Sequence, residues 1–220
     1  SSTGSTDLGT LPGGYDSVAY DINDNSQVVG TSGGRPFLWN SSSGMTDLGT
    51  LPGGYNSSAS AINNAGQVVG GSGRRAFLWS SSTGMIDLGL LPGRYPASDG
   101  DTSYASDIND AGQVIGISSS SLNGIRPFLW SSSTGMVELN SLIDPNLNVR
   151  LDFPAAINNQ GQIVGNSRYD RSAYLLTPKS STPVPEPLTT GGSILAGTGL
   201  VYLRRRYGRL RRSQNNPLQE

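Results

Sequence analysis

The stretch ASAINNAGQVVGGSGRRAFLWSSSTGMIDLG, residues 59–89, contains four short apolar segments separated by turn-forming residues. The first segment ends at Ile62, and the others are QVVG (67–70), FLW (77–79) and MIDLG (85–89). Short apolar runs of this length favour β-strands, and the Gly, Ser and Asn residues between them favour tight turns. The stretch therefore predicts four short antiparallel strands.

The same pattern recurs along the chain at intervals of roughly 40–50 residues, a spacing typical of β-propeller blades. Three units are complete, over residues 15–49, 55–89 and 95–140, and a fourth unit, 151–177, lacks its last segment. The isoleucine that ends the first segment marks the register of the four units, at Ile22, Ile62, Ile108 and Ile157.

Each predicted sheet has apolar side chains on both faces. In FLW, Phe77 and Trp79 point to one face and Leu78 to the other, and Val68 and Val69 divide in the same way. Sheets of this kind must be covered on both sides. The sequence therefore predicts an all-β fold, a β-propeller of about four four-stranded blades, with a β-solenoid or a sandwich as the alternative.

One glycine recurs in the second segment of every unit, where the absence of a side chain permits close approach of another backbone. These glycines are Gly30, Gly70, Gly116 and Gly165.

The segment TDLGTLPGG occurs at residues 6–14 and again, unchanged, at 46–54. Residues 5–9 match the strand that the fourth unit lacks, so we expect Leu8 in one sheet with Tyr174 and Leu175, closing the ring. The alternative is that these residues end an earlier repeat. Because the chain begins without Met or an apolar signal segment, we also expect sequence upstream of it.

The chain has no His and no Cys, which excludes His-based nucleophilic catalysis, Cys/His zinc sites and haem ligation by His. Asp7, Asp47 and Asp87 recur at one repeat position, and Glu138 replaces that Asp in its own repeat. A catalytic residue is needed at one site only, so recurrence indicates a structural role. DINDN (21–25) lacks the ligand set of a calcium loop. We therefore expect no enzyme activity, no metal and no cofactor.

Two kinds of link are expected on one side of the ring: those joining consecutive units, and those between the second and third segments. An Arg guanidinium pairs with carboxylate or sulfate, and a Tyr ring covers an apolar sugar face, so this side is a candidate site for acidic polysaccharide. The alternative is that the Arg side chains pair with the recurrent Asp residues and the Tyr rings pack on neighbouring blades. The candidate binding residues are Tyr15, Tyr55, Tyr95, Arg35, Arg75 and Arg126.

The composition changes after the repeat domain (1–178), into a Pro-rich linker at 179–187, an uncharged run at 188–203 and a basic tail at 204–220. As a helix the uncharged run reaches about 24 Å, short against a bilayer core of about 30 Å. We expect a transmembrane helix with the basic tail in the cytoplasm, the alternative being a disordered polar tail. A basic cluster after an apolar run indicates a membrane and no nucleic-acid partner.

The order of the tail's parts resembles the PEP-CTERM sorting signal of exopolysaccharide-producing Gram-negative bacteria, over about residues 183–212. The resemblance implies cleavage by an exosortase-type membrane protease, transient residence in the inner membrane, and delivery to the cell surface or extracellular matrix. The matching residues are Val184, Pro185, Glu186, Pro187, Arg204, Arg205 and Arg206.

The body, residues 5–177, resembles the HAF-repeat family of extracellular proteins, although Arg35, Arg75 and Arg126 stand at the place of the family's His. The resemblance implies a repeat and no defined activity. We therefore expect a non-catalytic exported surface or matrix protein. The alternative is a lectin-like binder of acidic polysaccharide, which includes exopolysaccharide, and a glycan-active enzyme is the least supported interpretation.

Overall fold

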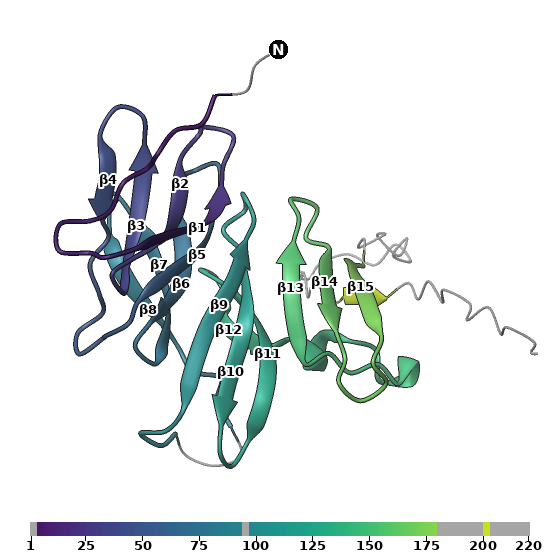
Figure 1. Cartoon of the computed structure of the whole chain (residues 1–220). Helices are drawn as coiled ribbons and strands as arrows, with labels where there is room; N and C mark the ends of the chain where they lie inside the picture. Colours follow the sequence, from purple (N-terminus) through teal and green to yellow (C-terminus); the bar gives the residue numbers. More distant parts are fainter. Residues whose placement is uncertain (1–3, 94–96, 180–199, 203–220) are drawn as a thin grey trace, which may run out of the picture.

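The computed structural model describes residues 4–93, 97–179 and 200–202 of the 220-residue chain. The described part is all-β, with four four-stranded antiparallel sheets and two short 3-10 helices (Figure 1). In every sheet the strands pair in chain order. The three complete units of the sequence analysis are the first three sheets.

The bounds of the strands follow the four segments of each unit. The first sheet contains β1 (Ser17–Ile22), β2 (Val28–Ser32), β3 (Arg35–Asn40) and β4 (Gly44–Asp47). The second contains β5 (Ser58–Ile62), β6 (Val68–Ser72), β7 (Arg75–Ser80) and β8 (Gly84–Gly89). The third contains β9 (Thr102–Ile108), β10 (Val114–Ser120), β11 (Gly124–Ser131) and β12 (Gly135–Glu138).

The fourth sheet follows the two 3-10 helices, η1 (Leu139–Leu142) and η2 (Pro145–Leu147). It contains β13 (Phe153–Ile157), β14 (Ile163–Asn166), β15 (Ala173–Pro178) and β16 (Leu200–Tyr202). The third sheet lies between the second and the fourth (Figure 1).

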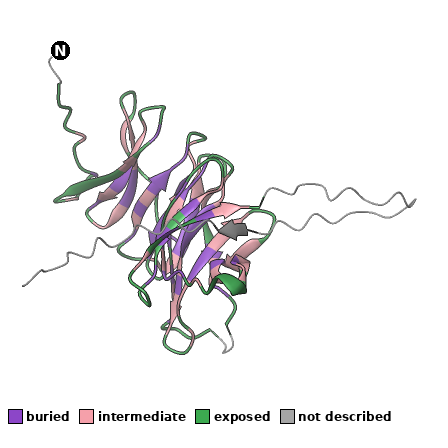
Figure 2. Ribbon diagram, turned by 90° about the vertical axis from the view of Figure 1, so that its right-hand side faces the viewer, coloured by how far each residue is buried: buried purple, intermediate pink, exposed green. Residues whose placement is uncertain are grey.

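Consecutive sheets pack face to face, and alternation along each strand assigns side chains to the two faces. In the second sheet, Val68 and Phe77 pack in the cluster shared with the first sheet. Val69 and Leu78 pack in the cluster shared with the third sheet. A third cluster, which includes Ile115, joins the third and fourth sheets. The predicted two-sided cover is confirmed for the inner sheets, and Figure 2 shows the buried residues in the strands.

The recurring glycine of the second strand permits close backbone approach, as predicted. A Cβ added to Gly30, Gly70 or Gly116 would overlap the carbonyl oxygen of the first strand of the same sheet. At Gly165 that Cβ would lie 2.8 Å from the carbonyl oxygen of Phe153. A bulge in the pairing of the first two strands occurs at or beside these positions in each sheet.

The predicted closure by the N-terminal segment is wrong. Residues 4–16 form no strand. The edge of β15 that they were expected to join is paired with β16 instead, with Leu176 opposite Tyr202. The side chain of Asp7 accepts from the Gly9 amide at 2.9 Å, a contact that Asp47 and Asp87 repeat with Gly49 and Gly89. The segment then binds the first sheet, where the Leu11 amide donates to Ser32 Oγ at 3.0 Å.

The predicted helix at 188–203 conflicts with the structure at its end, because residues 200–202 form β16. Its other residues, the linker from residue 180 and the basic tail lie outside the described residues. This includes Val184–Pro187 and Arg204–Arg206, the expected sorting signal. Within the ranges that the structure describes, no helix is long and apolar enough to cross a bilayer.

Candidate functional site

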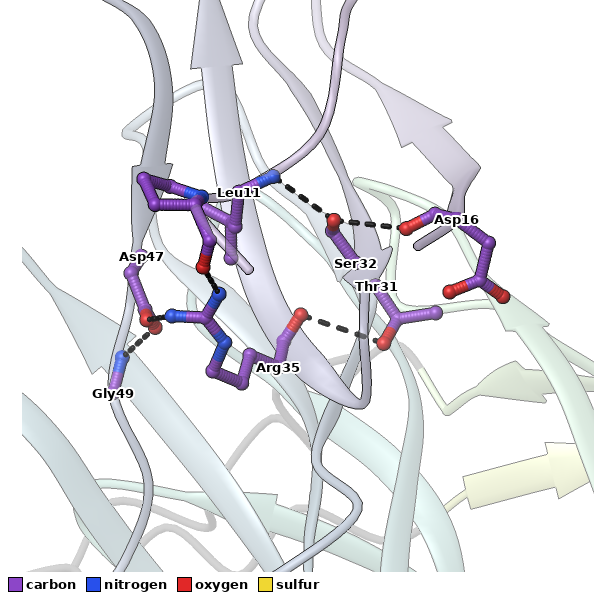
Figure 3. A network of polar contacts seen from close by, with 8 residues as sticks. Leu11, Asp16, Thr31, Ser32, Arg35, Asp47 and Gly49 are labelled. Carbon is purple, nitrogen blue, oxygen red and sulfur yellow. Dashed lines mark hydrogen bonds and ion pairs between the residues drawn. The ribbon is translucent and has the colours of Figure 1, made fainter. Parts of the chain in front are cut away.

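Arg35, at the start of β3, joins the N-terminal segment to the first sheet (Figure 3). One guanidinium nitrogen lies 2.6 Å from Asp47 Oδ2, and another donates to the carbonyl of Pro12 at 2.6 Å. The Asp47 carboxylate also accepts from the Gly49 amide at 2.9 Å. The guanidinium of Arg35 is therefore occupied by contacts within the fold.

Arg126 occupies the equivalent position in the third sheet and has equivalent contacts. Its guanidinium donates to the carbonyls of Leu91 at 3.0 Å and Pro92 at 2.8 Å, and lies 3.6 Å from Glu138 Oε2. Its Nε is buried with no hydrogen-bond partner among the described residues. Arg35 thus agrees with the alternative interpretation, in which these arginines pair with the recurrent Asp residues, and Arg126 pairs with Glu138, which replaces that Asp in its repeat.

Arg75, the equivalent residue of the second sheet, has no ion pair or hydrogen bond from its side chain to any described residue. It lines a cavity of about 540 Å³ together with Tyr55, Arg74 and Asp87. Arg74 donates to the carbonyl of Asp99 at 2.6 Å, so its position is fixed. This cavity, bounded by residues 51–55, the β6–β7 turn and β8, is called the Arg75 groove below.

The three candidate tyrosines do not form one site with the three arginines. Tyr15 is fully exposed, so it does not pack on a neighbouring sheet, and Tyr55 is 61% exposed. Tyr95 lies outside the described residues. Of the candidate residues that the structure describes, Tyr55 and Arg75 line one cavity. A second cavity, of about 360 Å³, contains Arg126 and Arg150.

At the opposite end of the sheets, the turns after the first strands surround a cavity of about 290 Å³. An asparagine in each of the first three turns donates from its side chain to the backbone of the next turn. Asn23 donates to the Asn63 carbonyl at 3.0 Å, Asn63 to the Asn109 carbonyl at 3.1 Å, and Asn109 to the Asn158 carbonyl at 3.0 Å. We call this row of bonds the asparagine ladder.

The residue after each ladder asparagine forms a second row of contacts. The Asp24 amide donates to Asn64 Oδ1 at 3.0 Å, the Asn64 amide to Asp110 Oδ1 at 2.8 Å, and the Asp110 amide to Asn159 Oδ1 at 2.8 Å. Hydrogen bonds from Asn64 and Asn159 hold the pKa of Asp110 below its usual value. Acid and amide alternate along this row, so no two carboxylates are neighbours.

Two further carboxylates join the sheets from within the first strands. Asp21 accepts from the Ile62 amide at 2.9 Å, and Asp107 accepts from the Ile157 amide at 2.7 Å. Burial raises the pKa of Asp107, and the charge of Asp21 adds to this effect.

The contacts between turns were not predicted from the sequence, because the INN and IND residues were expected to bond only within their own hairpins. The signal that could have found them was the recurrence of asparagine at the same turn position in all four units. Within residues 4–93, 97–179 and 200–202, no group of three acidic side chains is placed to hold a metal ion.

Comparisons with protein-family models, curated proteins and solved structures give no match to this chain.

Proposed function

We propose that this chain is a non-catalytic exported protein of the cell surface or extracellular matrix, built on a repeated β-sheet framework. The observation that carries the proposal is the structural use of the recurrent carboxylates. Asp47 binds Arg35 and the Gly49 amide, and Asp110 binds the turns on both sides. Groups engaged in this way hold the framework and are poorly placed for acid–base chemistry.

The four sheets are, in this proposal, blades of a propeller-type arrangement. Face-to-face packing of consecutive sheets and the cavity at which all four turns meet support this interpretation over a solenoid or a sandwich.

Assays for release of reducing sugar from acidic and neutral polysaccharides test the absence of catalysis. The proposal expects no release above that of a heat-denatured sample. Release that is abolished by an Asp47→Asn or Glu138→Gln substitution, in a chain that still folds, would overturn it.

The proposed route of export is the C-terminal signal, recognised by an exosortase-type membrane protease. Residues 200–202 pair with β15 in the described fold, so insertion of this segment in a membrane requires β16 to leave the sheet. Three residue pairs hold β16, so its release requires less free energy than the release of an inner strand.

Localisation in a host that contains an exosortase tests this route. Glu186→Ala, and replacement of Arg204–Arg206 by Ala, should leave the protein in the cell envelope and reduce its delivery to the surface. Gln214→Ala, a neutral change in the same tail, is the matched control. Surface delivery unchanged by both signal variants would contradict the proposal.

A second candidate function is binding of acidic polysaccharide in the Arg75 groove. Arg35 and Arg126 are occupied within the fold, whereas Arg75 lies beside exposed Tyr55 in an open cavity. A guanidinium without a partner among the described residues, next to a phenol ring, suits a sugar carboxylate or sulfate and the apolar face of the same sugar.

Titration of the full chain with a polyuronate at low and moderate salt tests this candidate. Arg75→Ala and Tyr55→Ala should each weaken binding, whereas Arg35→Ala and Tyr15→Ala, the equivalent changes in the first sheet, should leave it unchanged. The candidate fails if no salt-sensitive binding occurs, or if Arg75→Ala binds as the wild type does.

A further inference from the structure

The first sheet has one face that no other described sheet covers. Ile22 is 61% exposed, whereas its equivalents Ile62, Ile108 and Ile157 are 5–7% exposed beneath the preceding sheet. Val28 is half-buried where the equivalent residues of the other sheets are fully buried. The N-terminal segment, through Leu11, covers part of this face and leaves the Ile22 end open.

The fourth sheet has an open face of the complementary kind. Val164 is 43% exposed, whereas Val29, Val69 and Ile115 at the same position are fully buried beneath the following sheet. Leu175 is 39% exposed and its equivalent Leu78 is 7% exposed. Among the described sheets, the first and the fourth thus each have an open face whose residues are buried by a neighbouring sheet elsewhere in the molecule.

The asparagine ladder is also incomplete at these two ends. Asn158 is exposed, and its side-chain amide donates, among the described residues, only within its own turn, to Gln162 Oε1 at 2.8 Å. No hydrogen bond joins Asn158 or Asn159 to the turn of the first sheet, and both turns belong to the described part of the chain. The Asn23 carbonyl accepts from Ser26 in its own turn and, unlike the carbonyls of the later ladder residues, receives no asparagine side chain from the described residues.

The polar residues of the two open ends match each other. At the junction of the second and third sheets, Asn64 donates to Asp110 from its backbone and its side chain. A junction of the fourth sheet with a first sheet would place Asn159 against Asp24, the same pair of residue types. It would also preserve the alternation of acid and amide, so no carboxylates would be opposed.

The backbone amide of the isoleucine that ends each first strand is also compatible with a junction between the fourth and first sheets. At the second-to-third junction Ala61 offers no carboxylate, and the Ile108 amide donates to Asp107 of its own strand at 2.8 Å. The fourth sheet has Ala156 at this position, and the Ile22 amide already donates to Asp21 of its own strand at 2.8 Å. A fourth-to-first junction therefore leaves this amide satisfied.

We propose that the open face of the fourth sheet packs on the open face of the first sheet in a second copy of this chain. Asn158 then donates to the Asn23 carbonyl of the second copy, and Asn159 binds its Asp24. The junction repeats the three interfaces already present within the molecule. Such contacts join different surfaces of the two copies, so they produce a closed ring or an open chain of copies.

The mass of the full chain in solution, measured over a concentration series, tests the association. The expected result is a concentration-dependent rise from the 23.0 kDa monomer to at least twice that mass. Ile22→Glu should raise the dissociation constant on the order of tenfold or more, because a buried apolar contact becomes a buried charge. Leu122→Glu is the matched control: Leu122 has the same 61% exposure, lies in the β10–β11 turn, and should not change the association.

Cysteine cross-linking tests which faces meet, on a chain that has no natural Cys. The side chains of Asn159 and Asp110 are in contact at 2.7 Å, so Asp110→Cys with Asn159→Cys in one chain is the positive control for a link within a molecule. An equal mixture of the single variants Asn159→Cys and Asp24→Cys should form a covalent dimer on oxidation, and neither variant alone should do so.

Three outcomes would overturn the proposal. The first is a monomeric mass at every concentration, and the second is association unaffected by Ile22→Glu. The third concerns a chain that carries both Asp24→Cys and Asn159→Cys. A disulfide between these two positions within one chain at high dilution would show that the molecule closes on itself.

Discussion

The side-chain amide of Asn63 donates to the backbone carbonyl of Asn109 at 3.1 Å, across the boundary between the second and third sheets. The same side chain donates to Gln67 Oε1 at 2.7 Å and accepts from the Ala65 and Gln67 amides. One buried residue therefore fixes its own turn and positions the next sheet. Because an asparagine recurs at this position in each turn, the turns themselves help to set the spacing between consecutive sheets.

Replacement of the recurring glycine should be strongly destabilising. In Gly70→Ala the new methyl group would overlap the Ser58 carbonyl oxygen, a backbone atom that cannot move without breaking the β5–β6 pairing. We expect a loss of about 1–3 kcal/mol in the free energy of unfolding, measured by urea denaturation. Gly100→Ala, where the added carbon lies 3.8 Å from its nearest neighbour, should change this free energy by less than about 0.5 kcal/mol. Equal losses in the two variants would refute the close approach.

The equivalent arginines should differ in their effect on stability. Arg35→Ala removes a half-exposed ion pair with Asp47 and the bond to Pro12, and should lower the free energy of unfolding by about 1 kcal/mol. Arg75→Ala removes no such contact with a described residue and should have little effect. Thermal melts of both variants measure this, and a larger loss for Arg75→Ala would contradict the assignment.

The pH dependence of stability should report Asp107. Its folded pKa lies above the ordinary value of 3.8, so its contribution to stability is fully present below the unfolded pKa and is lost as pH rises through the folded pKa. Relative to Asp107→Asn, which does not titrate, the wild type should therefore lose unfolding free energy as pH rises from about 3 to 7. Any bond lost in the variant adds an offset that does not depend on pH.

Urea denaturation of both proteins at several pH values gives this difference. The carboxylates of Asp110 and Asp170 have lowered pKa values and contribute stability that is lost on acidification. These two carboxylates are present in both proteins, so their contributions cancel in the difference between the wild type and Asp107→Asn. A difference that is constant with pH would contradict the assignment.

The sheets could be predicted from the sequence because alternating apolar residues and turn glycines act locally. Phe77 and Leu78 must point to opposite faces of any strand, so two-sided cover followed from the residues alone. The close backbone approach at Gly70 was predictable for the same reason, because it depends only on the absence of a Cβ at that residue.

The strand that pairs with the edge of β15 could not be predicted in this way. The segment TDLG at 6–9 is identical to 46–49, yet only the second copy includes strand residues, because Thr46 and Asp47 pair with the preceding strand β3 and no described strand precedes residues 6–9. The edge of β15 pairs instead with residues from a distant and compositionally different tail. Competition between two segments for one edge depends on the whole fold.

The sequence also did not show which of the equivalent arginines make contacts within the fold. RPF and RAF differ little as sequence, but the guanidinium of Arg126 reaches the Leu91 and Pro92 carbonyls and that of Arg75 has no such contact with a described residue. The links before Arg35 and Arg75 share the sequence LPGG and the same turn hydrogen bond, yet only Arg35 bonds the proline carbonyl, so the repeat pattern does not specify the difference.

Consecutive sheets are joined through their turns, in a row of hydrogen bonds that is open after Asn158. The unfolding free energies of Asn63→Ala and Asn158→Ala, compared at a concentration where the chain is monomeric by mass, test this arrangement most directly. Both variants lose the bonds within their own turn, but of these two residues only Asn63 is buried and donates to a following sheet. We expect a loss of about 2–3 kcal/mol for Asn63→Ala and about 1 kcal/mol for Asn158→Ala. Equal losses, or a larger loss at Asn158, would contradict the claim.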